Sequence, residues 1–170
     1  MVRIFGCIII IILSAAAGYL YTRRFTGRIL ILKDAEDKFG TMEREVMFSR
    51  NPLPDICGRL GEEPGMLSKV MYYAFREMNV KNMAFSEAWS KGVTELLEDS
   101  SLKPDQKREL ASLGKGLGEG NLEEQKKCFE RIKFELGKMV NEAEEEKKRL
   151  EKMYMSLFFF GGTGLSIILI

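Results

Sequence analysis

The sequence predicts an all-α protein, built as a small helical bundle on an antiparallel two-helix stalk with a transmembrane helix at each end. No stretch alternates apolar and polar residues for long enough to form a strand. Apolar residues at helical spacing recur through most of the chain, and an uninterrupted apolar segment occupies each end. With 170 residues, the chain has room for one modest domain between those segments.

The longest predicted helix occupies residues 121–170. One column of apolar residues stands seven apart without interruption: Leu122, Phe129, Leu136, Ala143, Leu150 and Leu157. A second column of the same period is broken by two polar residues, Gln125 and Glu146, and otherwise contains Ile132, Met139, Met153 and Phe160. A sustained seven-residue period predicts a helix with a narrow seam that packs on a partner helix.

Both ends of the chain predict membrane helices. Residues 153–170 contain no ionisable group except the Tyr154 phenol, and about 27 Å of helix is just enough for a bilayer core. Residues 4–21 are either a cleaved signal peptide or an uncleaved span, and we favour the span because basic residues follow it. The predicted organisation is an N-terminal transmembrane helix (1–21), a cytoplasmic helical domain with the stalk (22–152) and a C-terminal transmembrane helix (153–170).

Small residues within the two predicted spans indicate close packing of membrane helices. Glycine lets two helix backbones approach each other in a bilayer. The candidates for this packing are Gly6, Gly18, Gly161, Gly162 and Gly164. The sequence leaves open whether the packing occurs within one chain or in a homo-oligomer.

A second helical seam follows the N-terminal segment and contains Leu32, Ala35, Phe39, Met42 and Val46. Because both ends are predicted to be anchored on the same side, this helix and the last one are expected to run antiparallel and bury their seams together. The alternative is that each seam packs on the short helices between them. Charged residues fill the opposite side, which we interpret as a solvated face: Asp34, Asp37, Lys38, Glu43, Arg44 and Glu45.

Short helices are predicted between the two stalk helices. Asn51–Pro52 ends the first stalk helix, because the residue before proline is pushed out of helical geometry. Apolar faces then predict helices at residues 53–60, 66–78, 85–97 and 105–113. Their expected inward residues include Cys57, Trp89, Leu96 and Leu97.

Composition argues against catalysis and against nucleic acid as a partner. The 26 basic and 25 acidic residues nearly cancel, so no net field attracts a polyanion. The absence of histidine removes the commonest general base and most zinc sites. We therefore expect no catalytic residue, cofactor or metal, and keep the acidic Glu43 and Glu45 only as candidates for contact with a partner protein.

The segment between Gly114 and Gly120 contains four glycines and has the composition of a phosphate-binding loop. Phosphate loops require a strand before the glycines, whereas a helix is predicted here. The favoured interpretation is a helix end and tight connection, in which glycine supplies positive φ. Gly114 and Gly118 are kept as further candidates for a partner interface.

The order of these features resembles the stage III sporulation protein AB family. The resemblance covers essentially the whole chain and rests most on Glu43-x-Glu45-Val46, on Asn51–Pro52–Leu53–Pro54, and on the paired Leu-Gly dipeptides Leu113–Gly114 and Leu117–Gly118. Ala88–Trp89, Gln125 and Tyr154-x-x-Leu157 add to it. Asn51 stands where threonine is expected, and both residue types cap helices.

The resemblance implies a non-enzymatic scaffold or platform in the mother-cell membrane around the forespore. The scaffold would belong to a mother-cell-to-forespore channel that is similar to type II secretion, and would dock a cytoplasmic ATPase, the AA protein of the same set. The alternative is a membrane-tethered sensor or receptor whose helical bundle binds a small ligand.

Overall fold

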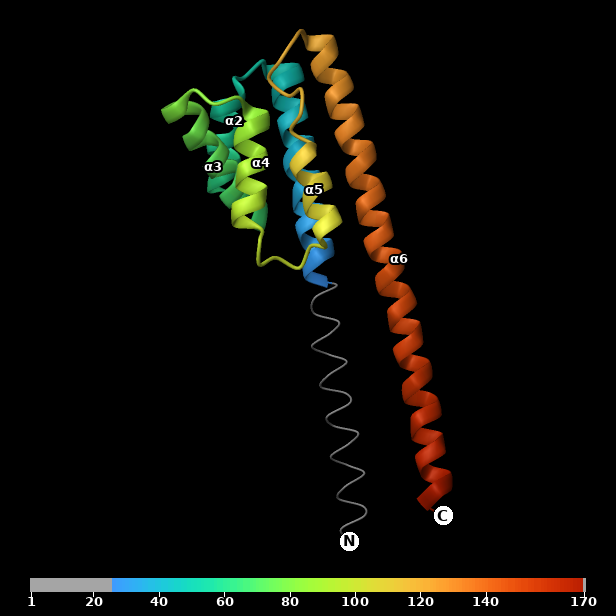
Figure 1. The fold of residues 1–170 in the computed structure, drawn as a ribbon. Coiled ribbons are helices and arrows are strands. Elements are labelled where there is room, and N and C mark those ends of the chain that lie inside the picture. Colours follow the sequence, from blue (N-terminus) through green and yellow to red (C-terminus); the bar gives the residue numbers. More distant parts are fainter. Residues whose placement is uncertain (1–25, 170) are drawn as a thin grey trace.

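The computed structural model describes residues 26–169, and all of its regular elements are helices (Figure 1). A helix at residues 26–44 continues into the wide turn η1 (Glu45–Ser49). Four short helices follow: α2 (Leu53–Glu62), α3 (Met66–Lys81), α4 (Phe85–Leu96) and α5 (Pro104–Ser112). The chain then enters the long helix α6 (Leu122–Leu169). The predicted all-α class is confirmed for this part of the chain.

The helix at 26–44 lies beside α6, and the two run antiparallel (Figure 1). Three ion pairs connect them: Arg28–Glu146 at 2.8 Å, Lys33–Glu144 at 2.7 Å and Glu43–Lys133 at 2.7 Å. Along the first helix the residue numbers in these ion pairs rise, while the numbers of their partners on α6 fall, as expected for two antiparallel helices. In this structure the two helices that pair belong to the same chain.

A single apolar core joins the stalk to the short helices. It contains the predicted seam of the first helix from Leu32 to Met42 and the seam of α6 from Phe129 to Ala143. Trp89 of α4 is fully buried, and its ring lies 5.0 Å from Phe39, edge to face, and 6.0 Å from Phe85, stacked. Its indole Nε1–H donates to the carbonyl of Leu110, 2.8 Å away. The two seams therefore pack against each other and also against the short helices, so both interpretations of the seams hold.

Three predicted core residues lie at the surface instead. Leu96 is 43% exposed because α4 ends there, and Leu97 takes the interior position with 1% exposure. Leu122 and Met153 are each 47% exposed. Leu122 is the first residue of α6, and Met153 lies beyond the last stalk ion pair on this helix, so neither lies beside another helix of the described residues. Within the described residues, the buried part of the seam is confined to residues 129–143.

The predicted membrane segments have different positions relative to the described residues. Residues 1–21, with Gly6 and Gly18, lie outside them. Residues 153–169 form the end of α6 and contain Gly161, Gly162 and Gly164. In the described part of the chain, no helix is both long and apolar enough to cross a bilayer. Packing of these glycines stays a prediction.

Candidate functional site

The predicted interface residues Glu43 and Glu45 are both engaged inside the molecule. Glu43 accepts the ion pair from Lys133 of α6. Glu45 turns toward α2, where it pairs with Arg59, and also accepts a 3.1 Å hydrogen bond from the Asn51 side chain. Each carboxylate therefore connects the first helix to a different neighbour. Contact of these residues with a partner protein stays a prediction.

Asp34 and Lys38 do not lie on a solvated face, so that part of the interpretation is wrong. Asp34 caps α3, since its Oδ2 accepts the Leu67 backbone N–H at 2.9 Å. Lys38 is only 2% exposed, and its ammonium donates to the Leu60 carbonyl and to Glu63, both at 3.2 Å. A buried charge is tolerated only when it is paired and hydrogen-bonded, which this arrangement provides. Both side chains hold the first helix against α2 and α3.

Residues 114–120, called the glycine-rich corner below, are held in place by Gln125 of α6. Gln125 is the first polar residue that interrupts the apolar seam of this helix. Gln125 is 6% exposed. Its Oε1 accepts the Gly118 N–H at 3.1 Å, and its Nε2 donates to the carbonyls of Gly116, at 3.3 Å, and Glu119. A side-chain amide can serve backbone donors and acceptors at once. The polar residue that interrupts the apolar column therefore fixes the corner to α6.

Gln125→Ala is expected to lower the free energy of unfolding by about 1–3 kcal/mol, because the Gly118 N–H loses its partner. Urea unfolding of the full chain in mild detergent, followed by the fluorescence of its single tryptophan, measures this. The exposed Lys126→Ala is the matched control on the same helix. A loss no larger than that of Lys126→Ala would contradict the assigned role.

Gly114 and Gly118 are required by space and by backbone geometry. A Cβ on Gly114 would lie 2.7 Å from Cδ1 of Trp89. Gly118 has φ +84°, and a Cβ there would lie 2.8 Å from Cδ1 of Leu53. Glycine is the residue that adopts positive φ without steric cost. These positions explain the two Leu-Gly dipeptides, while contact with a partner at the corner stays a prediction.

Glu146 is the second polar residue that interrupts the seam of α6. With Arg28 and Lys103 it forms a cluster of charged residues at the base of the domain, called the neck below. It accepts Arg28, whose side chain is only 3% exposed, and Lys103, which lies just before α5, both at 2.8 Å. The hydrogen bond from Lys103, followed by that from Arg28, holds the pKa of Glu146 below its usual range. One carboxylate therefore ties together the first helix, α6 and the start of α5.

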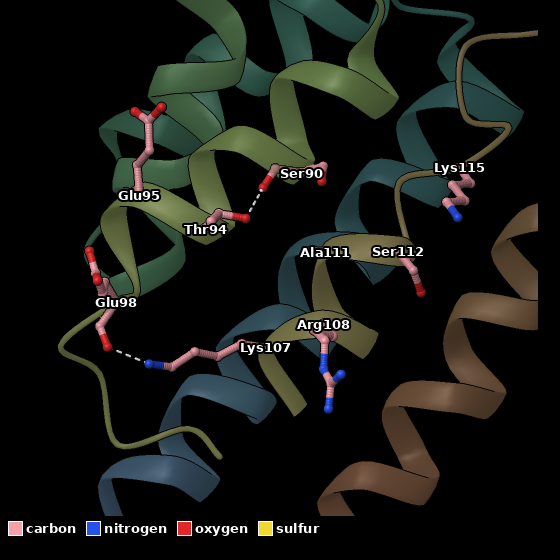
Figure 2. Close-up of a pocket in the computed structure, with 9 residues that line it drawn as sticks. All are labelled: Ser90, Thr94, Glu95, Glu98, Lys107, Arg108, Ala111, Ser112 and Lys115. Atoms are coloured by element: carbon pink, nitrogen blue, oxygen red, sulfur yellow. Dashed lines mark hydrogen bonds between the residues drawn. The ribbon is translucent and has the colours of Figure 1, made fainter. Parts of the chain in front are cut away.

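An open groove of about 560 Å³ separates α4 from α5 (Figure 2). Lys107 donates to the Glu98 carbonyl, and the Thr94 hydroxyl donates to the Ser90 carbonyl. The lining has mixed charge and no aromatic side chain, and also includes Glu95, Arg108, Ala111, Ser112 and Lys115. Lys, Glu, Ser and Ala are depleted at protein interfaces, so this lining is typical of a hydrated groove.

A second groove, of about 530 Å³, lies along α3. Its lining is richer in aromatic and apolar side chains, with Tyr72 and Tyr73 from α3 and Leu96 from the end of α4. Tyr72 is 48% exposed. Lys69 and Arg76 add positive charge. Aromatic residues and arginine are enriched where proteins bind each other.

Two of the cysteines lie among the described residues, one in the core and one beside it. Burial raises the pKa of the Cys57 thiol to about 12, so it is a protonated core side chain. Cys128 is half-buried beside the core. No group of three or more acidic or cysteine side chains in the described part of the chain is placed to hold a metal ion.

These observations define an all-helical protein. Glu43 and Glu45, predicted as candidates for a partner interface, connect helices of the same molecule. The comparisons identify its relatives. The chain belongs to the stage III sporulation protein AB family, whose model matches residues 3–170. It is 22% identical over 170 residues to Stage III sporulation protein AB of Bacillus subtilis (strain 168), covering 99% of each chain. No solved structure matches it. The resemblance seen in the sequence is confirmed.

Proposed function

We propose that the protein is a non-enzymatic membrane scaffold of a mother-cell-to-forespore channel that resembles type II secretion. It would lie in the mother-cell membrane around the forespore, cross it twice, and hold its helical domain in the cytoplasm. There the domain docks a hexameric ATPase, the AA protein of the same set. The family assignment supports a role in sporulation. The channel and the ATPase are what the resemblance in the sequence implies, and the arguments below support the membrane topology.

The observation that carries the proposal is the register of the stalk. Arg28 and Glu146 are in contact at 2.8 Å. Arg28 lies seven positions after Tyr21, where the predicted N-terminal span ends, and Glu146 lies seven positions before Met153, where the other begins. A helix rises 1.5 Å per residue, so each interval would span about 10 Å if the helical prediction holds through it. The two predicted spans would therefore enter a membrane at the same level.

The charge of the flanking residues supports the orientation. Arg23 and Arg24 follow the first predicted span, and a cluster of basic residues precedes the second: Lys147, Lys148, Arg149 and Lys152. Basic residues beside spans remain on the cytoplasmic side. Both boundaries thus favour a cytoplasmic helical domain.

Binding of the purified ATPase to the full chain in lipid nanodiscs tests the scaffold role. The proposal predicts saturable binding, measured by biolayer interferometry, that is absent with empty nanodiscs. A chain that fails to bind the ATPase and instead retains a small molecule through purification would contradict the proposal and indicate a ligand-binding module.

A further inference from the structure

The outer side of α3 presents an exposed row of residues. Lys69, Tyr72, Arg76 and Val80 are three and four positions apart and so share one face of the helix. Val80 is 74% exposed and Tyr72 48%. The row is about 16 Å long, or three turns. Together with the 43% exposed Leu96 of α4, these residues are called the α3 face below.

Neighbouring helices hold the α3 face in shape. Gly61 of α2 lies so close that a Cβ there would be 2.9 Å from the Cα of Tyr72. Gly92 of α4 approaches the Tyr73 ring in the same way, at 3.1 Å from its Cδ1. The groove beside the row therefore lies on tightly packed helices. Preformed surfaces lose less conformational entropy on binding.

The charges of the α3 face are available for a partner. Among the described residues, neither Lys69 nor Arg76 forms an ion pair with a carboxylate. Lys81, in contrast, is held by Glu77 at 2.7 Å. Two cations without an ion pair among the described residues therefore line the groove with Tyr72 and Leu96, and the carboxylate of the same groove, Glu77, is already paired with Lys81. Such a surface is complementary to an apolar segment that carries acidic residues.

The position of the α3 face also leaves it accessible. In Figure 1, α3 lies on the side of the domain away from α6. The α4–α5 groove is the competing surface. It also contains cations, Lys107, Arg108 and Lys115, of which Lys107 donates to the Glu98 carbonyl, but its lining lacks aromatic anchors. Hot spots of protein interfaces are enriched in Tyr and Arg.

We propose that the α3 face docks an amphipathic helix of a partner protein, with apolar side chains on Tyr72 and Leu96 and carboxylates on Lys69 and Arg76. Three turns of such a helix match the length of the row. This inference rests on the proposed function, under which the partner is the cytoplasmic ATPase.

The test is binding of the purified ATPase to the full chain in nanodiscs, with wild type, Arg76→Glu and Tyr72→Ala. The matched control is Arg108→Glu, which makes the same charge change at the α4–α5 groove. All three substituted residues are exposed, so circular dichroism spectra and melting temperatures are expected to stay close to wild type. Arg76→Glu and Tyr72→Ala are each expected to weaken binding at least about tenfold, and Arg108→Glu less than about twofold.

The outcomes separate the two proposals. Wild-type binding that Arg76→Glu and Tyr72→Ala leave unchanged would overturn the α3 face while leaving the scaffold function standing. Equal weakening by Arg76→Glu and Arg108→Glu would also overturn it, because the attraction would then be a general charge effect. If wild type does not bind the ATPase, the proposed function fails and the inference fails with it.

Discussion

Trp89→Ala is expected to lower the free energy of unfolding by about 3–5 kcal/mol, which is a large part of the stability of a domain of this size. The substitution removes a fully buried indole that contacts Phe39 of the first helix and Phe85 of α4. It also removes the indole hydrogen bond to the Leu110 carbonyl, which keeps only the Leu113 backbone N–H as a donor. Urea unfolding of the full chain in mild detergent, followed by far-ultraviolet circular dichroism, measures the loss.

Trp89→Phe separates the two contributions. Phenylalanine keeps most of the apolar volume but cannot donate to Leu110, so a smaller loss, about 1–3 kcal/mol, is expected. Val80→Ala is the control for an apolar truncation at an exposed site. If Trp89→Ala destabilises no more than Val80→Ala, Trp89 is not the centre of the core.

Glu146→Lys is expected to cost about 3–5 kcal/mol, because it removes the carboxylate that Arg28 and Lys103 share and puts a third cation in its place. The new ammonium would face Arg28, whose side chain is 3% exposed, and Lys103. Glu145→Lys makes the same change at the neighbouring exposed position, which has no ion-pair partner among the described residues. Urea unfolding monitored by Trp89 fluorescence measures both variants. Equal losses in the two would contradict the role of the neck.

The pH dependence of stability supplies an independent check on Glu146. Its pKa is lowered in the folded state by Lys103 and Arg28, so its contribution is present above the ordinary carboxyl pKa of 4.5. That contribution is lost as the pH falls through the lowered value. Glu146→Gln is therefore expected to be less stable than wild type at pH 7, by about 1–3 kcal/mol, and to approach wild type below pH 4.5. A difference that stays constant from pH 7 to pH 3 would contradict this.

Glu109 of α5 is expected to have the opposite effect on the pH dependence of stability. Burial, together with the neighbouring Glu135 carboxylate, raises the pKa of Glu109. A raised carboxyl pKa means that the folded state binds the proton more tightly, so this group favours folding more as the pH falls. Its contribution partly offsets the loss at Glu146 in acid, which is why the Glu146 effect is read as a difference from Glu146→Gln.

The helices could be predicted closely because the signals that define them are local. Periodic apolar residues and Pro52 placed the short helix after the first stalk helix, and α3 was predicted to begin at Met66, where it does begin. Turn and cap residues act within a few positions of the chain. The fold class and the order of elements followed from these signals alone.

The polar contacts could not be predicted in the same way, because they depend on which helices become neighbours. Lys38 belongs to a charged face in the sequence, but it is buried once α2 packs over it. Gln125 and Glu146 did leave a signal, as polar breaks in an apolar column. Each break marks a side chain with a tertiary partner, Gly118 in one case and Arg28 in the other.

Leu96 illustrates the limit of periodicity at the end of a helix. Both Leu96 and Leu97 fit the inward face of α4, and only the position of the helix end decides which one is buried. Helix ends are the least certain part of such a prediction. The leucine left outside is the one that contributes to the α3 face.

The central claim is that the helical domain lies in the cytoplasm between two membrane spans, and thiol accessibility tests it most directly. The reporter is Glu119→Cys in the exposed corner, in a chain that carries Cys7→Ser and Cys128→Ser. The native Cys57 is fully buried and serves as an internal control that reacts only on unfolding. Intact cells are treated with a membrane-impermeant maleimide. Protection in intact cells and labelling after lysis is the predicted result. Labelling in intact cells would place the domain outside and contradict the account.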